Sequence, residues 1–205
     1  MLRKFSFALC LGITLSGFIH TLSAQDSGQH EWTKIRVIDA DSAQAIAQAL
    51  AELQYPQLNS KDSICVAEYI DEHPVTLIWY FASWCWNCNQ EAPVLHRLYQ
   101  KYHSNGFQVL GIGVYSPEEK LKEFQTTYDL EFPIVVGPST VKEKASRQLT
   151  YHYRFRKAVG DSRTWGTPFS VFILNGNLSD IKVAAGEFTE KDLNTLLKNH
   201  LQPEN

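Results

Sequence analysis

Cys85 and Cys88 are two thiols separated by only two residues, and they follow an apolar run at residues 75–81. The sequence after them has the periodicity of a helix, which places the pair where a strand passes into a helix N-terminus. Unpaired backbone N–H groups and the helix dipole favour a thiolate at that position, and the second thiol lies one turn further on. We therefore expect the pair to exchange electrons with the cysteines of other proteins.

Metal binding is the competing use of a C-x-x-C pair. The sequence contains no second C-x-x-C and no C-x-x-H that could complete a tetrahedral zinc site. Two thiolates alone can hold Cu(I), a soft ion, although no Met-rich or His partner is evident around the pair. Because the two thiolates alone could bind this ion, a Cu(I)-handling chaperone is the alternative function.

The first 24 residues have the pattern of a secretory signal peptide. Arg3 and Lys4 precede an apolar stretch over residues 5–19, and small residues lead up to Ala24 as in a cleavage site. The stretch is shorter than the ~20 apolar residues that a membrane-spanning helix needs. We expect residues 1–24 to be removed and a soluble mature form to be exported to the periplasm, or secreted if the source is not a Gram-negative bacterium.

Composition bounds the class of protein. The chain has 205 residues, and without residues 1–24, which carry two cations and no acid, 17 cations face 22 acids and the net charge is −5. A mildly acidic surface argues against nucleic-acid binding. The remaining cysteines, Cys65, Cys85 and Cys88, are too few for a disulfide scaffold. We expect Cys65 to be a buried small apolar residue, with a regulatory or dimer-forming thiol as the alternative.

Hydrophobic periodicity outlines the rest of the domain. Amphipathic spacing predicts helices over residues 41–54, 66–70, 88–105, 118–128, 141–155 and from 189 onward. Apolar runs predict strands over residues 75–81, 107–115, 132–136, 169–174 and 181–184. Asp41 or Ser42 is expected to cap the first helix, Gly106 to follow the third, and Asn175-Gly176-Asn177 to form a hairpin turn. Residues 151–156 could also be extended.

The order of these elements resembles the thioredoxin fold, an α/β/α three-layer sandwich with a mixed central sheet. More narrowly, residues 84–93, with the sequence WCWNCNQEAP, resemble the W-C-x-x-C-x-x-E-x-P motif of the TlpA/ResA/DsbE-like periplasmic thioredoxins. The resemblance covers about residues 60–200. It implies a thioredoxin-like domain at 60–205, preceded by an N-terminal helical extension at 25–59 and the signal peptide at 1–24.

The site residues follow from this motif and its chemistry. Cys85 is expected to be the nucleophile that forms a mixed disulfide with a partner, and Cys88 the thiol that resolves it. Glu91 lies one helical turn beyond Cys88, where a carboxylate would raise a thiol pKa or accept its proton; the alternative is a solvated acid of the first turn. The resemblance implies a cis bond between Thr167 and Pro168, opposite the cysteines.

The surface around the pair is expected to bind the protein substrate. Trp84 and Trp86 flank Cys85 in the sequence, and the resemblance places Thr167 and Pro168 on the facing loop. Aromatic side chains of this kind give much contact area at low entropy cost. We therefore expect these four residues to be substrate-binding.

Trp79 departs from the family pattern. Many thioredoxins carry an acid, and many TlpA-like proteins an Asn, at this position six residues before the first cysteine. A proton relay through this site is therefore absent. Either Glu91 or water would have to deprotonate Cys88, or the resolving step would be slower. Trp79 is expected to be a core residue, with a place in an apolar partner-binding surface as the alternative.

The leading interpretation is an exported thiol–disulfide oxidoreductase that reduces selected protein disulfides, like the branch that serves cytochrome c maturation or thiol repair. It needs no cofactor other than a redox-active Cys85–Cys88 disulfide, but it needs an electron donor, which we expect to be a membrane protein. A disulfide oxidase or isomerase is the alternative, because Trp86-Asn87 does not indicate the direction of electron flow. A non-catalytic binding module is disfavoured by the intact cysteine pair. The histidines His96, His103 and His152 show no ligand spacing and receive no role.

Overall fold

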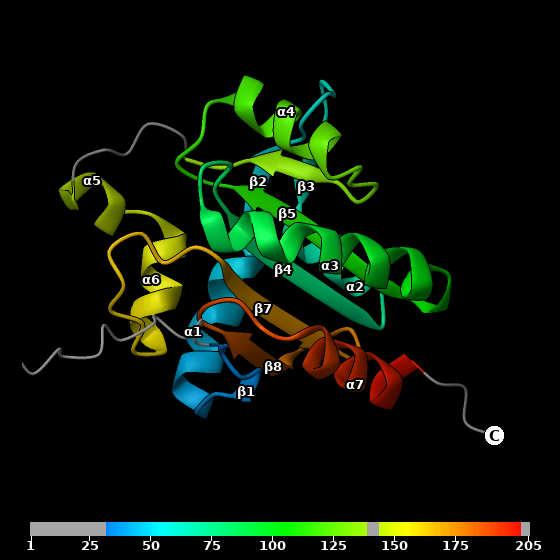
Figure 1. Cartoon of the computed structure of the whole chain (residues 1–205). Helices are drawn as coiled ribbons and strands as arrows, with labels where there is room; N and C mark the ends of the chain where they lie inside the picture. The colour runs from blue at the N-terminus through cyan, green and yellow to red at the C-terminus, as the bar shows by residue number, and fades with distance from the viewer. Residues whose placement is uncertain (1–31, 139–143, 202–205) are drawn as a thin grey trace, which may run out of the picture. The chain divides into compact units, whose positions relative to one another are not determined.

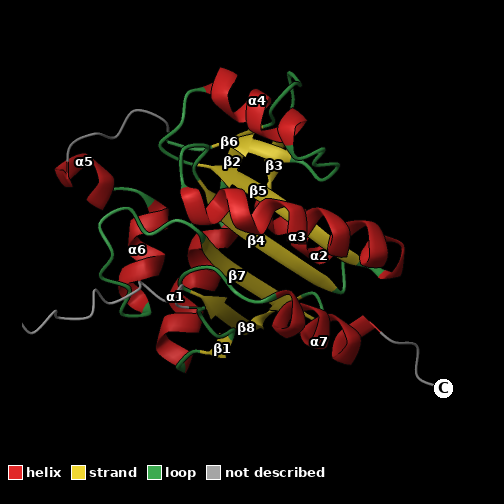
Figure 2. Cartoon of the chain, viewed as in Figure 1, coloured by secondary structure: helices red, strands yellow, loops and turns green. Residues whose placement is uncertain are grey.

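A six-stranded mixed sheet forms the centre of the protein in a computed structural model that describes residues 32–138 and 144–201 (Figures 1 and 2). Its strands are β1 Arg36–Val37, β4 Val75–Phe81, β5 Phe107–Gly113, β6 Ile134–Val136, β7 Phe169–Leu174 and β8 Asn177–Ala184, in the spatial order β1-β8-β7-β4-β5-β6. The strands β4, β5 and β6 run parallel, whereas β7, β8 and β1 pair antiparallel with their neighbours. A separate antiparallel pair joins β2 Gln54–Pro56 to β3 Ser63–Cys65.

Helices cover both faces of the sheet. They are α1 Ala40–Ala51, α2 Val66–Asp71, α3 Trp86–Tyr102, α4 Glu118–Thr127, α5 Lys144–Gln148, α6 Tyr151–Ala158 and α7 Glu190–Leu201. Two buried clusters lie between the sheet and these helices: α3, α4 and α7 contribute to one, and α1, α2 and α6 to the other. The predicted three-layer α/β/α sandwich with a mixed sheet is confirmed.

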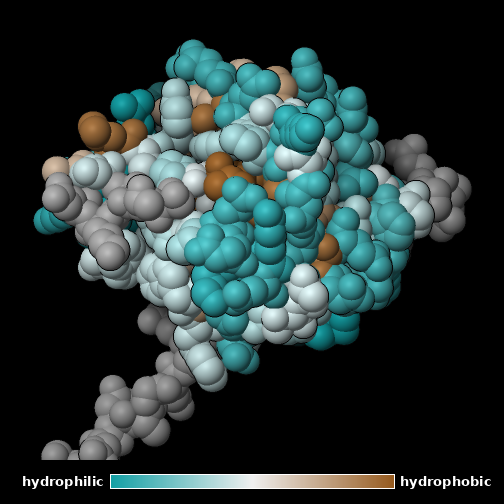
Figure 3. All heavy atoms as spheres, turned by 90° about the horizontal axis from the view of Figure 1, so that it is seen from above, coloured by the Kyte–Doolittle hydropathy of each residue, from teal (hydrophilic) through white to brown (hydrophobic). Residues whose placement is uncertain are grey.

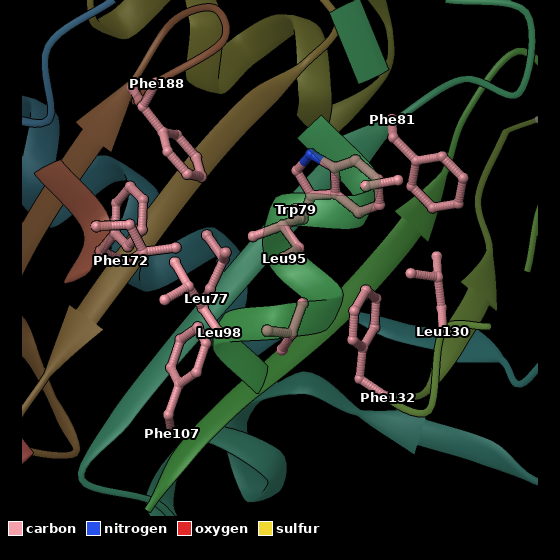
Figure 4. Packing of buried hydrophobic residues seen from close by; sticks show 14 of the residues in the cluster. Leu77, Trp79, Phe81, Leu95, Leu98, Phe107, Leu130, Phe132, Phe172 and Phe188 are labelled. Atoms are coloured by element: carbon pink, nitrogen blue, oxygen red, sulfur yellow. The ribbon is translucent and has the colours of Figure 1, made fainter. Parts of the chain in front are cut away.

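The strand β4 separates the two clusters. Its odd-numbered side chains, such as Trp79 and Phe81, belong to one cluster, and Ile78 and Tyr80 belong to the other. All seven residues are buried, as expected for a central strand that is covered on both faces. The rings of Trp79 and Phe81 are stacked with centroids 4.4 Å apart, and Leu95 of α3 lies close by (Figure 4). The bounds predicted for this strand are confirmed.

Local capping sets several element ends. The helix α1 begins after Asp39, whose carboxylate accepts a hydrogen bond from the Ser42 N–H at 2.8 Å, so the prediction that Asp41 or Ser42 is the cap was wrong. Gly106 has φ of 99° after a 3-10 turn, His103–Asn105, that extends α3, which confirms it as the residue that ends this helical segment. Thr189 accepts from the Asp192 N–H at 3.1 Å and caps α7.

The predicted helix over residues 141–155 is two helices. Thr150 caps α6 because its side chain accepts a hydrogen bond from the Tyr153 N–H, and this cap separates α6 from α5. The extended alternative for residues 151–156 is wrong, since they lie in α6. Residues 141–143, where the prediction began, lie outside the described residues.

The structure contains short strands that hydrophobic patterns did not predict. The segment after the first helix, expected only to break it, contains β2, and β1 lies at the edge of the sheet. The strand β8 begins at Asn177 rather than 181, because Asn175 and Gly176 both have positive φ and form a two-residue hairpin turn. Exposed side chains alternate with partly buried ones over residues 177–180, which gave no apolar signal.

The described chain from Trp32 onward is one compact unit, in which α1 packs against β8 and α6. The division into an N-terminal extension and a thioredoxin-like domain at residue 59 stays a prediction. The predicted signal peptide lies outside the described residues. Within residues 32–138 and 144–201, no helix is long and apolar enough to cross a membrane. Hydrophilic residues cover most of the face seen in Figure 3, where hydrophobic atoms occupy only small, separate areas.

Candidate active site

The cysteine pair lies where the central strand passes into α3. Four residues after the end of β4, Cys85 occupies the N-cap position of α3, and its Sγ accepts a hydrogen bond from the Cys88 N–H at 3.3 Å. The Asn89 side chain donates to the Cys85 carbonyl at 2.6 Å and thereby holds the turn. This confirms the predicted position of the thiols at a helix N-terminus.

This environment stabilises the Cys85 thiolate. A hydrogen bond from the Cys88 thiol, aided by the Thr167 hydroxyl and by the backbone N–H groups of Asn87 and Cys88, lowers the pKa of Cys85 to about 6, although burial opposes the change. The side chain is only slightly exposed at 7%. Cys85 therefore combines a thiolate that forms near neutral pH with limited contact with solvent.

Cys88 has the opposite character. It is fully buried, and its burial together with the neighbouring Cys85 raises its thiol pKa well above the ordinary value. Both residues are free thiols in the structure. The two thiols of the pair thus differ in acidity: the pKa of Cys85 is lowered and that of Cys88 is raised.

Glu91 is a buried acid, contrary to the alternative of a solvated one. It is 1% exposed, and its carboxylate accepts hydrogen bonds from the Trp79 indole N–H at 2.6 Å and the Phe188 N–H at 3.3 Å. Burial raises the pKa of Glu91 well above its usual range, and these two hydrogen bonds oppose the shift. Its charge interaction with Cys88 shows that the carboxyl group lies near the pair, as expected.

Trp79 is a core residue, and its alternative place in a partner-binding surface is wrong. It is fully buried, in the environment that Figure 4 shows between Phe81 and Phe188. A buried indole N–H requires an acceptor, and Glu91 supplies it. Sequence reasoning considered both residues separately but did not predict their hydrogen bond.

The facing loop brings Thr167 and Pro168 to the cysteines. The Thr167–Pro168 peptide bond is cis, as the resemblance implied, and the Thr167 hydroxyl interacts with Cys85. Thr167 and Cys85 lie far apart in the sequence, so only the fold brings them together. The roles of Thr167 and Pro168 in substrate binding stay predictions.

Exposed tryptophans surround Cys85. Trp86 is 73% exposed and Trp84 is 51% exposed, and the Trp84 indole donates a hydrogen bond to the Tyr115 carbonyl at 2.9 Å. Trp165, which the sequence analysis missed, packs edge-on against Trp84 with centroids 5.3 Å apart. An open groove of about 420 Å³ adjoins Trp84 and has Phe124 in its lining. Large apolar side chains therefore lie exposed on the surface beside Cys85.

Two further residues of the sequence analysis, Cys65 and His152, are placed by the structure as follows. Cys65 is partly rather than fully buried at the end of β3. His152, which received no role, is buried with Nδ1 2.9 Å from the Tyr115 hydroxyl and Nε2 3.2 Å from the Gly166 carbonyl. Burial and the Arg156 charge lower the pKa of His152 to about 3. Among the residues that the structure describes, no group of three or more His, Cys, Asp or Glu side chains could hold a metal ion.

This sheet, with a C-x-x-C pair at the start of α3 and a cis-proline before β7, defines a thioredoxin-fold protein. Solved structures share the fold: a secreted Mycobacterium tuberculosis disulfide oxidoreductase homologous to DsbE of E. coli has a TM-score of 0.54 at 14% identity, covering 74% of this chain and 98% of its own. A thioredoxin-family thiol:disulfide interchange protein from Chlorobium tepidum has a TM-score of 0.55 at 22% identity, covering 73% and 93%.

The sequence profile of the AhpC/TSA family matches residues 43–153, more than half of the chain, and the chain belongs to this family. The predicted resemblance to TlpA/ResA/DsbE-like thioredoxins is confirmed. Thiol-disulfide oxidoreductase ResA of Bacillus cereus is 31% identical over 30% of this chain and 35% of its own. ResA of Geobacillus thermodenitrificans is 25% identical over 60% of this chain and 59% of its own. The chain thus spans between about a third and three fifths of these relatives.

Proposed function

We propose that the protein is an exported thiol–disulfide oxidoreductase that reduces disulfides in selected proteins through Cys85 and Cys88. The observation that carries this proposal is the asymmetry of the pair. Cys85 is held as a thiolate at a helix N-terminus, and Cys88 is fully buried with a raised thiol pKa. The names of the ResA relatives, which are thiol-disulfide oxidoreductases, support the same chemistry.

The reaction has two steps that conserve atoms and electrons. The Cys85 thiolate attacks one sulfur of the partner disulfide, which forms a mixed disulfide and releases one partner thiolate. Cys88 then loses its proton and attacks Cys85 Sγ, which forms the Cys85–Cys88 disulfide and releases the second partner thiolate. The partner disulfide is reduced by two electrons, the pair is oxidised, and no further cofactor takes part.

Glu91 is the proposed proton acceptor for the second step. Its carboxyl group lies near the pair, and burial raises its pKa toward that of a thiol. Proton transfer is most efficient when the two groups have similar proton affinities. The hydrogen bond from Trp79 fixes the carboxyl group, since it holds Oε2 at 2.6 Å.

The direction of electron flow is proposed from the thiolate stability. A Cys85 pKa of about 6 is closer to the ~7 of thioredoxin than to the ~3.5 of the strong oxidant DsbA. We therefore favour reduction of exported proteins whose cysteines must be free, as in cytochrome c maturation or thiol repair. An exported reductase needs an electron donor because the periplasm provides no reductant buffer, and we propose a membrane protein.

The partner is proposed to bind across the surface around Cys85. Trp84 and Trp86 would supply apolar contact area, and Thr167 and Pro168 would face the partner chain from the opposite loop. The groove beside Trp84 offers room for residues that flank the partner cysteine.

Two measurements test this function. The reduction potential of the pair, equilibrated against glutathione, should lie near the ~−270 mV of thioredoxin; a value near the ~−120 mV of DsbA would replace the reductase by an oxidase. The Cys88→Ser variant should trap a mixed disulfide with exported proteins, and Cys85→Ser, the matched control, should trap none.

Copper handling is the other outcome of the test. If Cys88→Ser traps no partner while Cu(I) co-purifies stoichiometrically with the native pair, the metal function replaces the redox one. The burial of Cys88 and its raised thiol pKa disfavour a two-thiolate site.

A further inference from the structure

A buried charged cluster supports the loop that carries Thr167 and Pro168. The loop lies between α6 and β7, in the yellow-to-orange part of Figure 1. Asp161 accepts hydrogen bonds from Arg156 Nε at 2.9 Å and from Arg163 Nη2 at 2.7 Å. The side chains of Arg156 and Asp161 are each only 2% exposed.

The two guanidinium groups bind the backbone of this loop. Arg156 donates to the carbonyls of Arg163 and Trp165. Arg163 Nη2 donates to the Gly166 carbonyl at 3.2 Å and the Pro168 carbonyl at 3.1 Å. The cluster thus holds carbonyl groups on both sides of Thr167, the residue whose hydroxyl interacts with Cys85.

Gly166 shows how closely the loop fits the cluster. Its φ is +65°, and a Cβ at this position would lie 1.8 Å from Nε of Arg156. Only glycine allows the backbone to pass this close to the guanidinium, in a conformation that other residues rarely adopt. The path of the loop is therefore built around Arg156.

We propose that Arg163, held by Asp161 and Arg156, is a positioning residue that fixes Thr167 and Pro168 against Cys85. The cluster does not touch the reacting sulfurs and acts only through the loop. A planar guanidinium suits this task because its donors form a fixed fork, which a lysine ammonium lacks. This inference rests on the proposed function only in giving Cys85 the role of nucleophile.

Arg163→Lys tests the proposal, in a Cys65→Ala background that removes the third thiol. The Cys85 titration is followed by the ultraviolet absorbance of the thiolate. Lysine keeps the positive charge but lacks the forked donors of the guanidinium, so Thr167 is held less well. The midpoint of the Cys85 titration should therefore rise by about half a pH unit or more. Arg154→Lys is the matched control, because Arg154 is exposed on α6 and stacks on Tyr151; its midpoint should stay at the wild-type value.

A double mutant separates positioning from general loosening. If Arg163 acts through Thr167, the upward shift should disappear when Arg163→Lys is made in a Thr167→Val background. A folded Arg163→Lys protein with the wild-type midpoint would overturn the proposal, and so would an equal shift with and without the Thr167 hydroxyl.

Two further measurements keep the outcomes distinct. If Arg163→Lys does not fold, Asp161→Asn, which leaves both arginines in place, should raise the same midpoint, and its failure to do so would count against the proposal. Electron exchange of the wild-type protein with a disulfide peptide is measured separately. Its absence would overturn the proposed function, while the titration would still decide the role of Arg163.

Discussion

The Cys88→Ala variant gives the sharpest test of how the pair is activated. The thiol of Cys88 is the largest cause of the low pKa of Cys85, which is about 6. Removing it should raise that pKa, and a rise of about one unit is the order expected for the loss of one hydrogen bond to a charged sulfur. At pH 6 the fraction of thiolate would then fall from about half to about a tenth.

A change in reactivity partly offsets this loss of thiolate. The intrinsic nucleophilicity of a thiolate rises with its pKa, with a Brønsted coefficient of about 0.4–0.5, so one unit adds nearly threefold. The variant should therefore react about twofold more slowly than the wild type at pH 6 and nearly threefold faster at pH 9, where both are ionised. The two pH–rate profiles should cross.

The assay is a single-turnover reaction with a neutral, symmetric dipyridyl disulfide, in a Cys65→Ala background. The initial phase reports attack by Cys85, and the amount of pyridine thione released reports resolution. The wild-type pair should release two equivalents and Cys88→Ala only one, because the mixed disulfide cannot be resolved. Profiles that coincide at every pH would show that Cys88 does not set the reactivity of Cys85 and would refute the reasoning.

Other predictions concern buried and exposed side chains around the site. Burial raises the pKa of Glu91, so its contribution to stability is complete below about pH 4.5 and is lost as pH rises toward the folded pKa. The melting temperature of Glu91→Gln should therefore change less between pH 5 and 8 than that of the wild type. Glu190→Gln, at an exposed position, should keep the wild-type pH dependence. Burial lowers the pKa of His152 to about 3, so stability is lost as pH falls below about 6.5. Between pH 7 and pH 4, the melting temperature of His152→Gln should therefore fall less than that of the wild type. Trp86→Ala should raise KM for a protein disulfide severalfold with little change in melting temperature. Leu149→Ala, at a residue that is equally exposed at 73%, should change neither quantity. An unchanged KM for Trp86→Ala would remove that residue from the substrate site.

Much of the fold was predictable because its signals are local. The apolar run of β4 predicts a strand that is buried on both faces, and Asn175-Gly176 predicts a tight hairpin turn. The short strands β1 and β2 were missed because they have too few residues for a periodic pattern and depend on pairing with distant or neighbouring chain segments. The break between α5 and α6 depends on the Thr150 cap, which the continuous apolar spacing concealed.

The sequence by itself determined which residues form the candidate site. Cys85 and Cys88 are separated by only two residues within one strand–helix junction, so their spacing and the helix N-terminus are set locally. The same holds for Glu91, whose place one turn beyond Cys88 follows from the helical repeat. These features require no knowledge of contacts between distant segments.

Only the tertiary structure decided the environment that tunes this chemistry. Burial of Glu91 depends on the packing of α3 against Trp79 and on the Phe188 loop, and the Cys85 thiolate depends on Thr167, which a charged cluster holds in place. Desolvation and long-range hydrogen bonds arise from groups that are far apart in the sequence. The sequence therefore predicts which thiols react, whereas the fold sets their pKa values.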